Sequence, residues 1–291
     1  MGYSGRYHLA SLVAVFVALA IGILIGIGLA GDVVTSASEE LEQSLRSDLS
    51  ETEDELDSVK ERLELELQFE ELAYPALVNR RLMGLRVGVV SLGEPDEELV
   101  ADVREALEPA GAELASLTVI ATPPEADTLL ELAGPRVSPA ADELESLEEL
   151  GALAGGQIAR GEGALLDRLR PVLLSRASGR PQGIDQFLFA RSDPGELEET
   201  EAGQAAALDR GLIAGIDSKA EHVVGIERSG VEPTLLDPLA EAGIPTVDHL
   251  DLVAGRVSLV FALLGSEGDY GIKDEEDEYL PALIETTSRT P

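Results

Sequence analysis

Three histidines and one acidic run are the side chains in this sequence that could bind metal ions. His8, His222 and His249 lie far apart and form neither an H-x-x-x-H nor an H-E-x-x-H pair, the spacing that puts two imidazoles on one helix face. Each is interpreted as a surface or core histidine. The acidic run KDEEDEY, residues 273–279, lacks the spaced oxygen ligands of a calcium loop and is interpreted as a solvated acidic face.

Motifs for phosphate binding and nucleophilic catalysis are absent from the sequence. The first predicted strand leads into SLGEPDEE, not into a G-x-G-x-x-G turn, and no G-x-x-x-x-G-K-[ST] motif occurs. The glycine-rich run ALAGGQIARGEG, residues 152–163, is interpreted as a helix end followed by a loop. Ser218 has no nucleophile-elbow pattern around it. We therefore predict no enzyme and no catalytic, cofactor-binding or metal-ligating residue.

The net charge and the cysteine content exclude several kinds of partner and site. The chain has 291 residues, 56 Asp and Glu against 21 Lys and Arg, and a formal net charge of −35. A surface of this charge repels phosphates, which excludes a nucleic-acid partner. The chain has no cysteine, so disulfides, thiolate metal sites and cysteine nucleophiles are excluded as well.

Residues 9–30 predict a transmembrane helix. A run of about 20 apolar residues spans roughly 30 Å, the thickness of the hydrocarbon core of a bilayer. Arg6 precedes the run and Asp32 follows it, so the basic residues place the N-terminus in the cytoplasm and the bulk of the chain outside. The alternative is a cleaved signal peptide, because Gly28 and Ala30 suit a small-x-small cleavage site.

Small residues recur every four positions along this helix. Such a ridge lets a second helix approach closely and predicts a packing face for self-association. The alternative is that alanine and glycine are simply common here. The predicted face consists of Ala10, Ala14, Ala18, Gly22, Gly26 and Ala30.

Residues 33–74 predict an acidic coiled-coil helix. Apolar side chains there follow alternating spacings of four and three residues, with charged residues between them. The alternative is a single amphipathic helix packed on its own domain. The predicted seam consists of Leu45, Leu49, Thr52, Leu56, Val59 and Leu63, and a shifted seam continues with Leu65, Phe69, Leu72 and Ala76.

The remaining sequence alternates between strand and helix patterns, which is typical of an α/β domain. We predict one open, mainly parallel α/β layer domain, with residues 123–140 as a variable excursion. The predicted strands are residues 85–92, 113–120, 185–190, 221–229 and 245–250. The predicted helices are residues 97–112, 141–154, 163–176, 204–216 and 233–244. The predicted order is a cytoplasmic N-terminus, a transmembrane helix, a coiled-coil stalk, an α/β domain and an acidic C-terminal segment, at residues 1–8, 9–30, 33–74, 85–273 and 274–291.

Three stretches of the sequence together are similar to a known family. They are YHLASLVAVFVALAIGILIGIGL near the N-terminus, YPALVNRRLMGLRVGVVSL at the domain entry and GIPTVDHLDLVAGRVSLVFALLGSEGDYGIK near the C-terminus. The chain resembles the actinobacterial copper transporter family, of the mycobacterial copper transport protein B (MctB) type. The most specific part is a G-x-x-G-x-Y-G motif of unknown role, with Gly265, Gly268, Tyr270, Gly271 and the following Lys273. The family pattern has Asn where this chain has His249.

This resemblance implies a membrane-anchored envelope protein in copper efflux and copper homeostasis, with copper ion as the transported species and an outer-membrane, pore-forming role. The ligand chemistry contrasts with that role, because copper(I) prefers Cys and Met and the only methionines are Met1 and Met83. One apolar helix encloses no water-filled path, so transport requires a homo-oligomer. The alternative is a bitopic scaffold whose outer α/β domain binds an envelope partner. A third possibility is an exported enzyme with a ligand crevice at the carboxyl ends of its strands.

Overall fold

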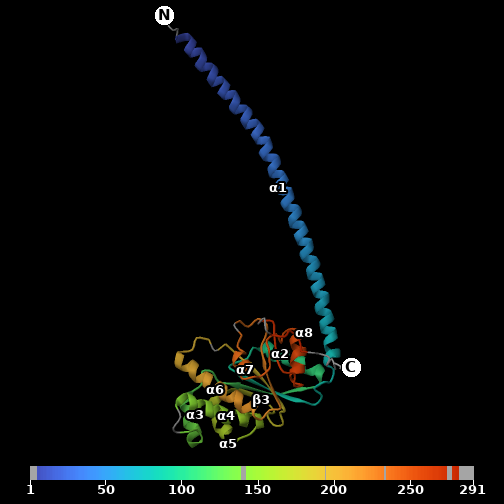
Figure 1. Ribbon diagram of the computed structural model, residues 1–291, viewed down its shortest axis with the longest axis vertical. Coiled ribbons are helices and arrows are strands. Elements are labelled where there is room, and N and C mark those ends of the chain that lie inside the picture. The colour runs from blue at the N-terminus through green and yellow to red at the C-terminus, as the bar shows by residue number, and fades with distance from the viewer. Residues whose placement is uncertain (1–4, 139–141, 194, 233, 274–276, 282–291) are drawn as a thin grey trace, which may run out of the picture. The chain divides into compact units, whose positions relative to one another are not determined.

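The computed structural model divides into two compact units, residues 1–68 and 69–291 (Figure 1). For residues 5–7 and 28–42 it describes the helical backbone but not the side chains. The residues it describes are 5–138, 142–193, 195–232, 234–273 and 277–281.

The first unit is helical. Helix α1 (Gly5–Val78) runs through this unit without interruption, and its last turns belong to the second unit. The segment His8–Ile27 is long and apolar enough to cross a membrane, and none of it is buried. The expected N-terminal apolar helix and the long helix that follows are therefore confirmed, whereas pairing as a coiled coil stays a prediction.

The second unit is built on one seven-stranded sheet in the order β3-β2-β1-β4-β5-β6-β7. All neighbouring strands are parallel except the pair β2 and β3, which is antiparallel. The predicted open, mainly parallel α/β fold is confirmed. The strands are β1 (Arg86–Leu92), β2 (Glu113–Ile120), β3 (Leu174–Gly179), β4 (Gln186–Arg191), β5 (His222–Ile226), β6 (Thr246–Val247) and β7 (Asp269–Tyr270).

The helices begin and end at residues whose chemistry suits those positions. The Asp96 and Asp142 carboxylates accept backbone N–H groups in the first turns of α2 and α4, and Gly111 and Gly161 end these helices in the left-handed conformation. The helices are α2 (Glu97–Ala110), α3 (Ala126–Ala133), α4 (Glu143–Arg160), α5 (Ala164–Leu173), α6 (Glu199–Asp217), α7 (Asp237–Glu241) and α8 (Val253–Ala262), with a 3-10 turn at Gly134–Arg136.

Alternating strand residues build two hydrophobic cores, one on each face of the sheet. In β1, Val87 and Val89 join the core shared with α2, α8 and the end of α1. Val90 and Leu92 point the other way and join the core shared with α3, α4, α5, α6 and α7. The unit is therefore a three-layer α/β/α domain.

The fold adds detail to two sequence interpretations. The expected excursion 123–140 contains α3 and the 3-10 turn, and its residues 139–140 lie outside the described part. The run 152–163 does contain a helix end and a loop, but the helix extends beyond the predicted range 141–154, because α4 continues to Arg160 with Gly155 inside it. A Cβ at Gly155 would lie 2.4 Å from the carbonyl oxygen of Leu212 in α6, so glycine lets the two helices approach backbone to backbone.

Candidate functional site

The predicted small-residue face of the apolar helix has no partner within the described chain. A Cβ added at Gly22 or Gly26 would meet nothing within 4 Å. Ala10, Ala14 and Ala18 are exposed, whereas the side chain of Ala30 lies outside the described residues. Self-association through this face stays a prediction.

The predicted coiled-coil seam is equally uncovered. Leu45, Leu56 and Leu63 are 58%, 51% and 53% exposed, although leucine is a residue that proteins bury. Thr52 is exposed and its hydroxyl donates to the carbonyl of Asp48 at 2.8 Å. The apolar side chains of the seam are therefore exposed in a single copy of the chain.

The C-terminal motif follows helix α8 and carries the last strand. Gly265 and Gly268 have φ values of +92° and +138°, which favour glycine. A Cβ at Gly265 would also lie 3.2 Å from the imidazole of His222. Tyr270 is buried in β7, and its hydroxyl donates to the carbonyl of Glu267 at 3.1 Å. The glycines therefore shape the loop that returns the chain to the sheet.

Lys273 joins this motif to the sheet through an ion pair and a hydrogen bond. Its ammonium lies 2.5 Å from the carboxylate of Glu227, which follows β5, and donates to the carbonyl of Arg228 at 3.1 Å. The side chains of Lys273 and Glu227 are only 12% and 3% exposed. Glu227 also accepts from the hydroxyl of Thr234 at 2.9 Å. The motif and the end of β5 thus share one buried ion pair.

Asp248, which follows β6, accepts three hydrogen bonds at the same place. The backbone N–H groups of Ile272 and Lys273 donate to it at 3.1 Å and 3.0 Å. The imidazole Nδ1 of His249 lies 3.0 Å from its Oδ1. Burial alone raises the pKa of Asp248, but these hydrogen bonds outweigh burial and hold the pKa below its ordinary value. A Cβ at Gly271 would lie 2.7 Å from this carboxylate, so only glycine fits beside it.

The three histidines occupy different settings. His249 is fully buried and stacks on Tyr279, with 5.5 Å between the ring centres. His222 begins β5 and is partly exposed, and His8 lies at the start of the apolar span. Among the residues that the structure describes, no three His, Cys, Asp or Glu side chains are grouped to hold a metal ion.

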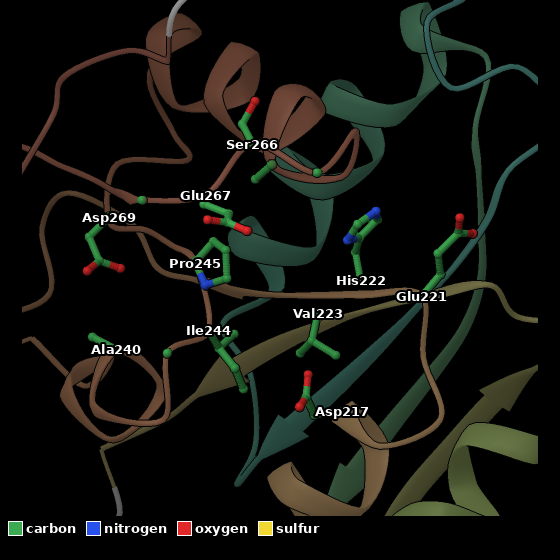
Figure 2. Close-up of a pocket in the computed structure, with 14 residues that line it drawn as sticks. Asp217, Glu221, His222, Val223, Ala240, Ile244, Pro245, Ser266, Glu267 and Asp269 are labelled. Atoms are coloured by element: carbon green, nitrogen blue, oxygen red, sulfur yellow. The ribbon is translucent and has the colours of Figure 1, made fainter.

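An acidic cavity of about 400 Å³ opens at the amino ends of β5 and β6. Figure 2 shows that its charged side chains come from the end of α6, the start of β5 and the segment that runs from α8 to the start of β7. They are four carboxylates and one imidazole, from Asp217, Glu221, Glu267, Asp269 and His222. Such a lining raises the local concentration of cations without fixing a coordination geometry.

A second cavity, of about 490 Å³, lies at the carboxyl ends of β1, β4 and β5. Strand order reverses between β1 and β4, and crevices at such points bind ligands in open α/β sheets. Here two lining side chains already form an ion pair, since Arg228 lies 3.5 Å from Asp96. The lining arginines also pair with carboxylates outside the cavity, because Arg228 lies 2.9 Å from Asp102 and Arg191 lies 3.4 Å from Asp209. Burial raises the pKa of Asp209 to about 6 against the opposing effect of Arg191 and Arg210.

A family model described as "Copper transport outer membrane protein, MctB" matches residues 3–281 of this chain. The chain belongs to the MctB family. It is 26% identical over 315 aligned residues to proteins named "Copper transporter MctB" from Mycobacterium bovis (strain ATCC BAA-935 / AF2122/97) and Mycobacterium tuberculosis (strains CDC 1551 / Oshkosh and ATCC 25618 / H37Rv). The alignment covers 91% of this chain and 95% of each relative.

Membership in the MctB family confirms the resemblance inferred from the sequence. The family match also includes the segment from Gly265 to Lys273. Sequence reasoning missed its partners, Glu227 and Asp248. Their signal was an acidic residue directly after a short buried strand, in VGIER and PTVDH, where parallel sheets gather polar side chains.

Proposed function

We propose that this chain acts in copper efflux and copper homeostasis as a membrane-anchored homo-oligomer. The N-terminus lies in the cytoplasm, and the α/β domain lies on the other side of the membrane. The observation that carries the proposal is the uncovered stripe from Leu45 to Leu63, next to an apolar span in a chain of the copper transport family. Exposed leucines at heptad spacing are stabilised by pairing with a second copy.

Copper is the transported species in this proposal. Copper(I) prefers thiolate and thioether ligands, and the sequence has no cysteine and only two methionines. A path for the ion therefore comes from an assembly, because one helix encloses none. The acidic cavity in Figure 2 attracts cations toward that assembly.

The first experiment measures self-association of the full chain in mild detergent by chemical crosslinking. We expect dimers or larger species, and we expect Leu49→Asp with Leu56→Asp to abolish them. The matched control is Ser47→Asp with Ser58→Asp, which adds the same charge outside the seam. Gly22→Leu with Gly26→Leu tests the span, and Ala20→Leu is its control. Crosslinked species that persist in both double variants would refute oligomerisation through these faces.

The second experiment measures copper content and growth under copper stress in a deletion strain. We expect deletion to raise cell copper, and we expect the intact gene alone to restore it. A version whose span and stalk are replaced by an unrelated monomeric anchor should fail. Unchanged copper after deletion would contradict the efflux proposal. Fractionation of the envelope then tests the outer-membrane location that the description of the family implies.

The alternative is a bitopic scaffold whose outer domain binds an envelope partner. It is favoured by the lack of a grouped metal-ligand set among the described side chains, which leaves copper handling to another protein. Flux of copper from liposomes that contain only the purified chain supports transport. A partner that co-purifies with the domain, without such flux, supports the scaffold.

A further inference from the structure

A small cavity of about 100 Å³ lies beneath the edge strand β3, on the face of the sheet that α4 and α5 cover. Its lining contains no carboxylate, although the chain has 56 acidic residues and both cavities described above are lined by carboxylates. Its polar side chains are three hydroxyls and one guanidinium, from Ser116, Thr118, Ser178 and Arg170.

Two of these hydroxyls belong to buried residues and make no hydrogen bond to the described part of the protein. Ser116 and Thr118 are 5% and 8% exposed and lie on the same face of β2. Neither hydroxyl bonds to a protein group in the described part of the chain, and neither oxygen is sealed from the cavity. Both line the cavity, so both are available to a molecule inside it.

The local charge is positive. Residues 160–183 contain five arginines and two acidic residues, against a net charge of −35 for the whole chain. Arg176 pairs with Glu94 at 3.3 Å, and Arg168 donates to the carbonyl of Ala133 at 3.5 Å. Arg170 lines the cavity and has no ion-pair partner among the residues with described side chains. Its guanidinium is free to bind an anion.

The walls of the cavity are fixed by backbone contacts. A Cβ at Gly161 would lie 2.3 Å from the carbonyl oxygen of Pro181, and one at Gly179 would lie 2.2 Å from that of Ala115. Both glycines have positive φ values, +73° and +83°. The cavity is therefore preformed, and the free-energy cost of rearranging its walls on binding is small.

We propose that this cavity binds a small oxyanion, a phosphate group, through the Arg170 guanidinium and the hydroxyls of Ser116 and Thr118. Guanidinium groups bind phosphate oxygens in charge-assisted pairs, and hydroxyls donate to the remaining oxygens. The volume holds roughly three waters at ~30 Å³ each, which is room for one such group and excludes a nucleotide. The phosphate belongs either to a free ion or to the headgroup of an anionic lipid, and both present the same chemistry.

The test uses the full chain in a neutral detergent at constant ionic strength. Binding of inorganic phosphate to the chain is measured by calorimetry. For the lipid, the chain is reconstituted into neutral nanodiscs, and its flotation with vesicles of phosphatidylcholine is compared with and without phosphatidic acid. Thr118→Val keeps the shape of the side chain and removes its hydroxyl, and Arg170→Gln removes the charge. The matched controls are Ser175→Ala on β3, whose hydroxyl bonds Glu94, and Arg168→Gln on α5.

We expect saturable binding that weakens at least tenfold in Thr118→Val and in Arg170→Gln and stays within twofold in the controls. Binding of phosphate with this pattern identifies the free ion, and binding of phosphatidic acid alone with this pattern identifies the headgroup. Circular dichroism of each variant shows that it folds. Absence of binding to both probes, or equal losses in Arg168→Gln and Arg170→Gln, would overturn the proposal. The outcome is independent of copper flux.

Discussion

Two adjacent glycines in α4 should respond to alanine with opposite signs. A Cβ at Gly155 would lie 2.4 Å from the carbonyl oxygen of Leu212 and 3.1 Å from its Cα. One residue later, a Cβ at Gly156 would meet only the carbonyl oxygen of Gly215, at 3.6 Å, an ordinary contact. The same substitution therefore tests the α4–α6 crossing at two positions in one helix.

The magnitudes follow from two opposing contributions. Alanine in place of glycine stabilises a helix interior by about 1 kcal/mol. Overpacking a close contact typically costs about 1–3 kcal/mol, and a clash of Cβ with backbone belongs at the upper end because backbone cannot rotate away. Gly155→Ala should therefore lower the free energy of unfolding by about 2 kcal/mol, whereas Gly156→Ala should raise it by up to about 1 kcal/mol.

Pulse proteolysis in urea measures both changes on the full chain. With a dependence of about 2 kcal/mol per molar urea, the midpoint should fall by about 1 M in Gly155→Ala and rise by up to ~0.5 M in Gly156→Ala. Gly155→Ser, which adds one atom more than alanine at the same place, should fall further. Equal midpoints for Gly155→Ala and Gly156→Ala would refute the close crossing.

Three further predictions concern buried polar groups. Because burial raises the pKa of Asp209 to about 6, the folded state keeps a proton that the unfolded chain releases near pH 4. The free energy of unfolding should thus fall by about 2 kcal/mol as the pH rises from 4 to 6, and chemical unfolding of Asp209→Asn across this range should lose this contribution to the slope. Lys273→Met leaves Glu227 as a buried unpaired charge, so urea unfolding should show a loss of about 3 kcal/mol that the double variant with Glu227→Gln partly recovers. Tyr74→Phe removes a hydrogen bond of 2.7 Å to a backbone carbonyl, and a thermal unfolding curve should show a loss of about 1 kcal/mol at the midpoint, whereas no change would mean that the bond contributes nothing.

The parts of the fold that the sequence predicted well carry strong periodic patterns. Residues 86–120 switch from strand to helix and back, with Asp96 capping the helix, and each change is visible locally. Strand β3 gave no such pattern, because five of its six residues are exposed and it pairs only along one edge. The predicted helix 141–154 stopped before Gly155, because glycine normally disfavours a helix interior unless another backbone lies against it.

The candidate site was harder to predict than the fold. Lys273 and Glu227 are 46 positions apart, and only the order of the strands brings them together. Asp248 and Gly271 meet for the same reason. A single sequence contains the residue types of such pairs but not the strand order, so the motif near the C-terminus was visible while its partners were not.

The strand order also has a consequence for how the domain folds as it is synthesised. Strand β4 pairs with β1, and β5, β6 and β7 then each pair with the strand made directly before them, so this edge of the sheet grows in the order of synthesis. Until Asp269 and Tyr270 are made, β6 is an open edge, and until Lys273 is made, the carboxylate of Glu227 lacks its cation. A ribosome that stalls before Asp269 therefore leaves a nearly complete domain with an exposed strand edge that can pair with other chains, and such a chain is a substrate for chaperones and proteases.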